Sequence, residues 1–219
     1  MGRLLSRAEL RRLYDRIGAR QDRLAFYRGP AVEALCAHGA FEGAASVFEL
    51  GCGTGQLAAR LLREQLPTNA RYVGVDLSGR MVQRARNRLA PFGARAAVHH
   101  TDGRLAFGQK AHSWERVVTA YVLDLLAPDD IRAFLREAHR LLSSDGRLCL
   151  TSLSMGGTRL TRLVSAAWDG LHALRPTWVG GCRPVEVRRF LSANRWSIRR
   201  DAEVSAWGIP STVVVAEPR

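Results

Sequence analysis

The chain has 219 residues, of which 47% are hydrophobic, and a formal net charge of +13 at pH 7. This length suits one domain with a sizeable core, and the lack of any apolar run of 18 residues excludes a conventional transmembrane helix. The four cysteines, Cys36, Cys52, Cys149 and Cys182, stand far apart with no C-x-x-C pair, so we predict neither a zinc site nor a disulfide framework. Because the N-terminus has no apolar signal core, we expect a cytoplasmic protein.

The positive charge is dispersed and consists almost entirely of arginine. All 33 basic residues except Lys110 are arginine, which indicates genomic composition bias rather than selection for binding phosphate. We therefore do not expect nucleic acid as a partner. The densest run lies in residues 3–28, where eight arginines recur at three- and four-residue intervals and share a helix face. That face is either simply solvated or makes a peripheral contact with an anionic membrane surface.

Residues 1–40 are predicted to be helical, since Leu10, Leu13 and Ile17 recur at near-helical spacing. Gly29-Pro30 is expected to interrupt this helix, with Pro30 opening a second one. Apolar strand segments follow at residues 45–50, 71–76, 95–100, 115–121 and 147–153. Helices are predicted between most of them, at 56–66, 79–90 and 129–143, with Ser78 as the N-cap of the second and Pro128 at the start of the third. Strands that alternate with helices predict a parallel sheet.

Residues 154–183 interrupt this alternation with a helical stretch between two glycine pairs. Ligands in open α/β folds bind outside the carboxyl ends of the strands, and an insertion after the fifth strand reaches that edge. The segment is therefore either a lid over a bound ligand or a longer connection packed on the sheet. Residues 184–219 are expected to complete the sheet as a helix at 185–193 and strands at 196–206 and 211–217, joined by a turn at 207–211.

Three strand ends carry matching chemistry. The first strand ends in Gly51-Cys52-Gly53-Thr54-Gly55, with Glu49 two residues before the first glycine. Asp76 ends the second strand, 25 residues beyond Gly51, and Asp102-Gly103 follows the third. A glycine-rich turn that opens a helix admits a ligand close to the backbone, and a carboxylate after the second strand is well placed for ribose hydroxyls. The pattern predicts a site for a nucleotide-like cofactor.

These motifs resemble those of the class I S-adenosylmethionine-dependent methyltransferases, over residues 45–153. The resemblance implies a Rossmann-like, doubly wound α/β fold whose seven-stranded sheet is mostly parallel, with one antiparallel closing strand and helices on both faces. It implies a single methyltransferase domain: an N-terminal helical cap (1–40), a cofactor-binding core (41–153), the lid insertion (154–183) and a C-terminal helix and hairpin (184–219).

The resemblance also implies roles for individual residues. Glu49 and the glycines of the first loop would hold the methionine portion of S-adenosylmethionine, or of its product S-adenosylhomocysteine. Asp76 would bind the ribose, and Asp102 with Gly103 would contact the adenine. The full set of expected cofactor-binding residues is Glu49, Gly51, Cys52, Gly53, Gly55, Asp76, Leu77, Met81, Asp102, Gly103, Ala120 and Tyr121.

Methyl transfer is an in-line displacement in which the enzyme mainly positions the acceptor and excludes water. A base is needed only when the acceptor must lose a proton, and the candidates are Tyr14, Tyr27, Tyr121 and Asp124. For each tyrosine a packing role is the alternative. The Tyr14-Asp15 pair resembles an element that precedes the sheet in methyltransferases of quinone and small-molecule pathways.

The sequence thus predicts a metal-independent methyltransferase that acts on a small, partly apolar acceptor. The alternative is an RNA-methylating or RNA-binding protein on the same fold. The sequence assigns neither the acceptor atom nor an oligomeric state.

Overall fold

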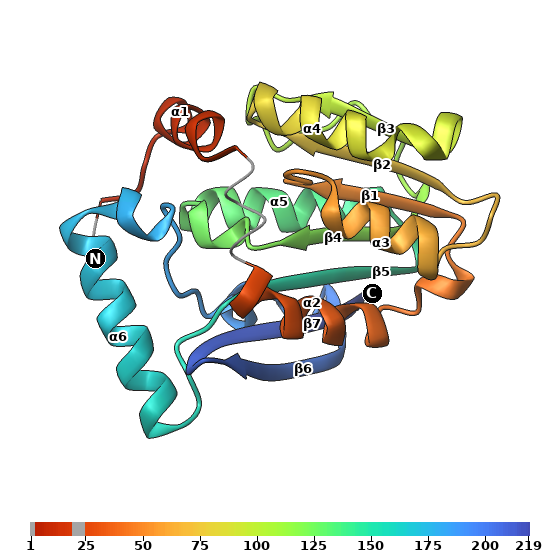
Figure 1. Cartoon of the computed structure of the whole chain (residues 1–219). Coiled ribbons are helices and arrows are strands. Elements are labelled where there is room, and N and C mark those ends of the chain that lie inside the picture. The colour runs from red at the N-terminus through yellow and green to blue at the C-terminus, as the bar shows by residue number, and fades with distance from the viewer. Residues whose placement is uncertain (1–2, 19–24) are drawn as a thin grey trace.

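The computed structural model describes residues 3–18 and 25–219, which form a sheet with helices on both faces (Figure 1). The sheet has seven strands in the order β3-β2-β1-β4-β5-β7-β6. The strands are β1 (Ser46–Leu50), β2 (Arg71–Asp76), β3 (Ala96–His100), β4 (Trp114–Ala120), β5 (Leu142–Leu153), β6 (Trp196–Ala206) and β7 (Ile209–Pro218). Strands β1 to β5 pair in parallel, and β7 runs antiparallel to both its neighbours. The predicted Rossmann-like fold is confirmed.

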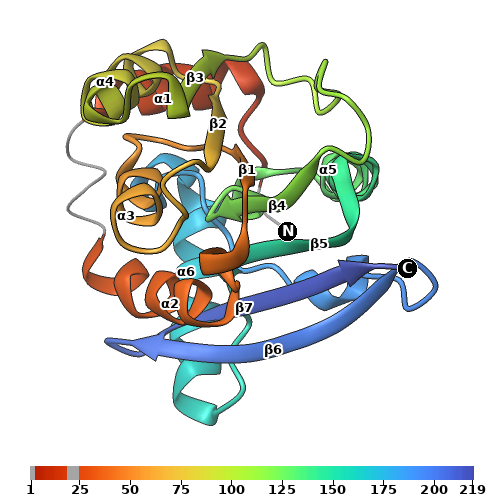
Figure 2. The same cartoon turned by 90° about the vertical axis from the view of Figure 1, so that its right-hand side faces the viewer.

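The helices divide between the two faces of the sheet. They are α1 (Arg7–Ile17), α2 (Ala25–His38), α3 (Gln56–Glu64), α4 (Gly79–Leu89), α5 (Pro128–Leu141) and α6 (Arg159–Leu174). Short 3-10 turns lie at Phe41–Gly43, Ala90–Arg95, Leu123–Leu125, Pro176–Val179 and Val187–Phe190. Apolar residues of α2, α3 and α4 form one core against the sheet, and those of α5 form a second core on the opposite face. Figure 2 shows the long β6–β7 hairpin at the edge of the sheet, with α2 packed on the same side.

Local sequence signals set several helix starts. Ser6 caps α1 in a capping box with Glu9. Ser78 caps α4 as predicted, since its Oγ accepts a hydrogen bond from the backbone N–H of Met81 at 3.2 Å. Pro128 begins α5, also as predicted, because the first helical position needs no N–H donor.

Some predicted boundaries are wrong. The helix α2 runs through Pro30 instead of starting there, because Tyr27, Ala31 and Leu35 form one continuous buried stripe while Pro30 is exposed. The helix expected at 185–193 is only the 3-10 turn Val187–Phe190. The Val185 backbone N–H bonds to the Leu153 carbonyl at 2.9 Å, which holds this stretch extended along β5.

Part of the predicted N-terminal helical region, residues 19–24 with Arg20 and Arg23, lies outside the described residues. Within the part of the chain that the structure describes, no helix has both the length and the apolar character needed to cross a bilayer.

Candidate active site

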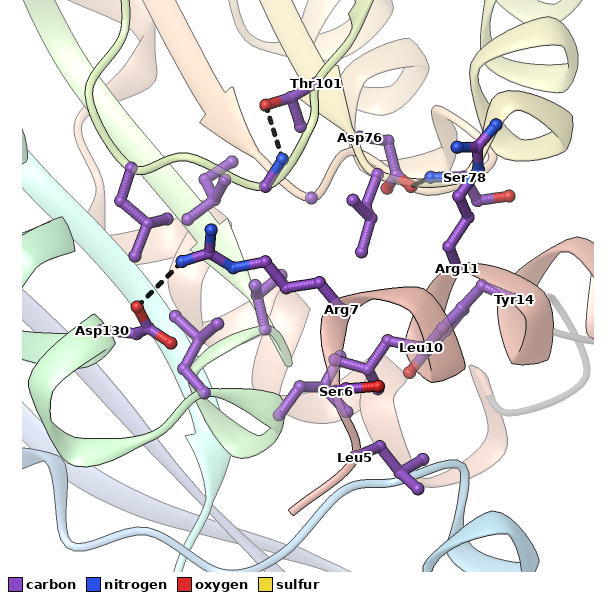
Figure 3. A pocket seen from close by; sticks show the side chains of 18 of the residues that line it. Leu5, Ser6, Arg7, Leu10, Arg11, Tyr14, Asp76, Ser78, Thr101 and Asp130 are labelled. Carbon is purple, nitrogen blue, oxygen red and sulfur yellow. Dashed lines mark hydrogen bonds and ion pairs between the residues drawn. The ribbon is translucent and has the colours of Figure 1, made fainter.

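A cavity of about 270 Å³ lies between α1 and the carboxyl ends of the central strands (Figure 3). Leu10 and Tyr14 of α1 form one wall, and Gly51, Asp76 and Tyr121 belong to the strand ends opposite. We call this space the first cavity. Its position is the one that open α/β sheets offer to ligands.

A second cavity, of about 630 Å³, lies on the other side of the glycine-rich loop. Glu49 and Gly53 line it from β1 and the loop, and Arg28 lines it from α2. The two cavities share three lining residues, Gly51, Ala120 and Tyr121. They therefore adjoin at the ends of β1 and β4, the two strands at the centre of the sheet.

The glycine loop needs glycine for two different reasons. Gly51 has φ +72°, and a Cβ added there would lie 2.2 Å from the Val122 Cγ2, so the position excludes a side chain. A Cβ on Gly55 would lie 3.1 Å from the Ala85 Cα, where α3 packs on α4. Gly55 also has a positive φ, +74°, so both positions combine a backbone conformation that favours glycine with a close neighbour.

Asp76 ties the end of β2 to the glycine loop. Its Oδ2 accepts a hydrogen bond from the Gly53 N–H at 2.9 Å, and its Oδ1 accepts one from the Ser78 N–H at 2.9 Å. Burial raises the pKa of the Asp76 carboxyl, and these two hydrogen bonds oppose that rise. The carboxylate still has free lone pairs, and it lines the first cavity.

Glu49 is a buried carboxyl beside the second cavity. The Tyr72 hydroxyl donates to its Oε2 at 2.5 Å. Burial raises the pKa of Glu49 to about 7, although the bond from Tyr72 lowers it. Among the described residues Glu49 has no ion-pair partner, so a cation that enters this cavity meets an uncompensated acidic group.

The sequence of this core matches a known family. Residues 47–146 match the family model described as a methyltransferase domain. These residues form a methyltransferase domain of the class I S-adenosylmethionine-dependent family.

Among curated proteins, the chain is similar to a demethylmenaquinone methyltransferase of Tropheryma whipplei (strain Twist), with 30% identity over 152 residues. That match covers 67% of this chain, and the chain spans only 60% of the relative's length. It is also similar to a tRNA(Thr) (cytosine(32)-N(3))-methyltransferase of Saccharomyces cerevisiae, 28% identical over 108 residues, which are 47% of this chain and 17% of that protein.

The fold also resembles that of the [4+2]-cyclase SpnF, with a TM-score of 0.74 and 14% identity over 99% of this chain and 98% of the cyclase. A magnesium protoporphyrin IX methyltransferase from Synechocystis PCC 6803 with bound S-adenosylhomocysteine gives a TM-score of 0.64 and 22% identity, over 94% and 86% of the two chains. Identities this low establish the fold alone.

Several of the expected cofactor residues line one of the two cavities. Leu77 and Gly103 line the first cavity, and Cys52 lines the second. Met81 is fully buried in α4, and Asp102 is exposed with its carboxylate bonded to the Arg104 N–H at 2.9 Å. Met81, Asp102 and Gly55 line neither cavity, so their roles toward the cofactor remain predictions.

The three candidate tyrosines come close to one another at the cavities. Tyr14 lines the first cavity and donates its hydroxyl to the Gly180 carbonyl at 3.2 Å. The ring of Tyr27 meets the ring of Tyr121 edge-on, with centroids 5.9 Å apart. Burial raises the pKa of Tyr27 to about 12 and the pKa of Tyr14 and Tyr121 above their usual range. At neutral pH these phenols are therefore protonated and suited to donating hydrogen bonds rather than accepting protons.

Asp124 lies in the turn that follows Tyr121. Its carboxylate accepts hydrogen bonds from the Ser152 hydroxyl and from the Leu153 N–H, the latter at 3.1 Å. Burial raises the pKa of Asp124 to about 7. The side chain is fully buried and lines neither of the two cavities.

Arg28 is the residue of this site that the sequence did not single out. Its guanidinium lies 4.8 Å from the ring centroid of Tyr121 and donates from Nε to the Tyr27 hydroxyl at 3.0 Å. A sulfur contact to Cys182 Sγ, at 3.9 Å, is its other hydrogen bond, and among the described residues it has no carboxylate partner. In the sequence Arg28 is one of eight similar arginines, and only the packing of α2 distinguishes it.

Two neighbouring residues near the C-terminal end of α1 tie this helix to other parts of the fold. Asp15 Oδ1 accepts a hydrogen bond from Ser78 Oγ at 2.5 Å and one from the Arg80 N–H at 3.3 Å, which joins α1 to the start of α4. The Tyr14–Gly180 bond joins α1 to the segment that follows α6.

The four cysteines are free and buried. Within residues 3–18 and 25–219, no group of three or more His, Cys, Asp or Glu side chains is arranged to hold a metal ion.

Proposed function

We propose that this methyltransferase transfers a methyl group from S-adenosylmethionine to a small, partly apolar acceptor, without a metal. The observation that carries the proposal is that the two cavities adjoin at Gly51, Ala120 and Tyr121. A cofactor with an adenosine half and an amino-acid half suits two connected cavities of different polarity. Its sulfonium supplies the activated methyl group.

The residues present fit the two halves of the cofactor. Asp76, Leu77 and Gly103 would hold the adenosine in the first cavity, with the Asp76 carboxylate toward the ribose hydroxyls. Glu49 and Arg28 both line the second cavity, and neither has an ion-pair partner among the described residues. An amino acid carries both charges, so Glu49 would receive the ammonium group and Arg28 the carboxylate, each through a charge-assisted hydrogen bond.

The acceptor would lie beside Tyr121, at the junction of the two cavities. Trp168 of α6 supports this region, because its ring contacts the ring of Tyr27 with centroids 5.8 Å apart and its Nε1 donates to the Cys182 carbonyl at 2.9 Å. We propose that residues 154–183 and the N-terminal cap together enclose the acceptor and exclude water. The proposal thus divides the chain into an N-terminal cap, a cofactor-binding core, a lid and a C-terminal hairpin.

The chain's own groups would act mainly by positioning. The Tyr14 hydroxyl already donates to the Gly180 carbonyl. The Tyr121 hydroxyl bonds to Ser211 Oγ at 2.9 Å, and when Ser211 is the donor in that bond, the phenol of Tyr121 can donate to an acceptor oxygen. The aromatic rings offer an apolar surface to the body of the acceptor. Because Asp124 lines neither cavity, we assign it a positioning role: its bonds to Ser152 and Leu153 hold the turn after β4 against β5. That turn is continuous with Tyr121.

The alternative is an RNA-methylating or RNA-binding protein on this fold. The chain does share a stretch with a tRNA methyltransferase. The basic residues of the N-terminal region could instead make a peripheral contact with anionic lipid. Two of them are already paired within the protein, Arg3 with Glu9 and Arg7 with Asp130 at 3.1 Å, which disfavours that contact. Steeply salt-dependent retention on heparin would favour the RNA alternative.

Titration calorimetry with S-adenosylhomocysteine tests the proposal for the cofactor. We expect saturable binding by the wild type, much weaker binding by Arg28→Leu, and unchanged binding by the control Arg136→Leu, an exposed arginine of α5. Transfer of a labelled methyl group to a panel of phenols, quinols and carboxylic acids then tests the reaction. A folded protein that gives no heat with the ligand would refute the proposal, and binding without any transfer would indicate a different use of the fold.

A further inference from the structure

The helix α6 is oriented in an unusual way. Surface helices ordinarily bury their apolar face and expose their polar one. In α6 the buried positions are Thr161, Ser165 and His172, beside a half-buried Trp168. The opposite stripe, at Leu160, Leu163, Leu171 and Leu174, is exposed. This helix therefore presents leucines to the surroundings.

The exposed apolar surface extends beyond the helix. We define the α6 face as Met155, Leu160, Leu163, Leu171, Leu174, Trp178 and Trp207, whose side chains are 43–83% exposed. Trp207 belongs to it because the β6–β7 turn lies against α6: a Cβ on Gly208 would be 3.4 Å from Val164 Cγ2. Among the residues that the structure describes, Phe26 is the only other exposed large hydrophobic side chain. In Figure 1 α6 forms the left-hand border of the molecule, with no other element beyond it.

Cations surround the α6 face. Arg159, Arg162 and Arg175 are exposed on the helix and at its end. Arg162 donates only to the carbonyls of Gly156 and Gly157, at 3.4 and 3.3 Å, and Arg175 lies 5.7 Å from the Trp178 ring centroid. None of the three has an ion-pair partner among the described residues.

Acidic groups near this surface are few and partly engaged. Asp169 lies half-buried on the flank of α6. Glu203 of β6 accepts hydrogen bonds from the Gly157 N–H at 3.0 Å and from the Ser154 hydroxyl at 3.2 Å. The positive charges thus dominate the edge of the α6 face.

We propose that the α6 face binds the surface of an anionic lipid bilayer, with α6 lying in the plane of the interface. Such helices combine an apolar face with flanking arginines, and tryptophan favours the boundary between acyl chains and headgroups. The 16 residues of α6 give an apolar strip about 24 Å long. A second copy of this chain is the poorer partner, because it would bring the same three arginines and the same excess of positive charge.

Binding of the α6 face to a bilayer does not depend on methyl transfer, but it would place the bilayer near the region proposed for the acceptor. The inner side of α6 carries Trp168, which packs on Tyr27 beside the junction of the two cavities. A bilayer bound to the outer side would lie one helix away from the acceptor region. An acceptor dissolved in that bilayer would then have a short route to the site.

Vesicle co-sedimentation of the full chain tests the proposal. The probes are vesicles of phosphatidylcholine alone and of phosphatidylcholine with about 30% phosphatidylglycerol, at low salt and at about 0.5 M salt. The variants are a leucine triple, Leu160→Ser, Leu163→Ser and Leu174→Ser, and an arginine triple, Arg159→Gln, Arg162→Gln and Arg175→Gln. The matched controls are Phe26→Ser, outside the α6 face, and the triple Arg63→Gln, Arg132→Gln and Arg136→Gln, which removes the same charge elsewhere.

We expect the wild type to bind the anionic vesicles and to lose most of that binding in high salt. Each arginine near the lipid is worth about fivefold in binding, equivalent to about 1 kcal/mol, so the α6 arginine triple should lose at least tenfold. The leucine triple should lose as much, and both controls should bind as the wild type does. Circular dichroism checks that the variants fold, which we expect because every substituted leucine is exposed.

Two results would overturn the proposal. One is a lack of specific binding: either the folded wild type does not bind anionic vesicles, or the α6 triples and the control triple reduce its binding equally. The other is a wild-type dimer in sedimentation velocity that the leucine triple converts to a monomer, since the α6 face would then be an interface between copies.

Discussion

The buried carboxyl of Glu49 makes the stability of this protein depend on pH in a predictable direction. Its pKa is about 7 in the folded protein against 4.5 when unperturbed, so the folded state holds the proton more tightly than the unfolded chain. The stabilisation is complete below about pH 4.5 and is lost as the pH rises through about 7. A difference of this size corresponds to about 3 kcal/mol of unfolding free energy.

Glu49→Gln isolates this contribution, because glutamine keeps an oxygen acceptor for the Tyr72 hydroxyl but cannot lose a proton. Relative to the wild type, the variant should have nearly the same unfolding free energy near pH 4.5 and gain about 3 kcal/mol by about pH 8. The pKa of Asp124 is also raised to about 7. Its contribution to the unfolding free energy is the same in the wild type and the variant, so it cancels in the difference between them. Tyr72→Phe should move the loss to higher pH, because it removes a donor that lowers the pKa of Glu49.

Urea denaturation of wild type and variant at several pH values measures these differences. Parallel stability curves across the window would refute the reasoning, since they would mean that Glu49 titrates alike in the folded and unfolded states. If Glu49 also receives the cofactor's ammonium group, S-adenosylhomocysteine should bind the wild type more tightly as the pH rises through 7. Glu49→Gln should lose both that increase and much of the affinity.

Three further outcomes are expected. Asp76→Ala should weaken S-adenosylhomocysteine binding at least tenfold by calorimetry, since charge-assisted hydrogen bonds contribute about 1.5–3 kcal/mol each, and Asp76→Asn should be milder; unchanged affinity would contradict the assignment. Gly51→Ala should lower the thermal midpoint and abolish cofactor binding through its clash with Val122, and an added Val122→Ala should restore part of the stability but not relieve the strain at φ +72°. Trp168→Ala should reduce acceptor turnover with unchanged cofactor affinity, whereas Trp178→Ala, at an exposed position, should change turnover less; the reverse order would move the acceptor site toward Trp178.

The cofactor-binding residues could be predicted from the sequence because the signals that mark them are local. The alternate glycines, Glu49 before them and Asp76 at the end of the second strand follow from one rule, that parallel strands end at the same edge of the sheet. The same local reasoning placed Ser78 as a helix cap and Pro128 as a helix start. It was wrong at Pro30, where a buried stripe along α2 outweighs the local cost of proline.

Tertiary structure alone decided the rest of the site. That Arg28 faces Tyr121, and that two cavities adjoin at Gly51, depends on how α2 and the turn after β4 pack, which no short sequence window contains. The helix α6 is the clearest case. Its periodicity predicts a helix, but the usual burial of leucines would give the wrong face, because the neighbours of α6 are Tyr27, Cys182 and a hairpin turn rather than a broad apolar sheet. An amphipathic helix has an apolar and a polar face, and the elements that pack against the helix determine which face is buried.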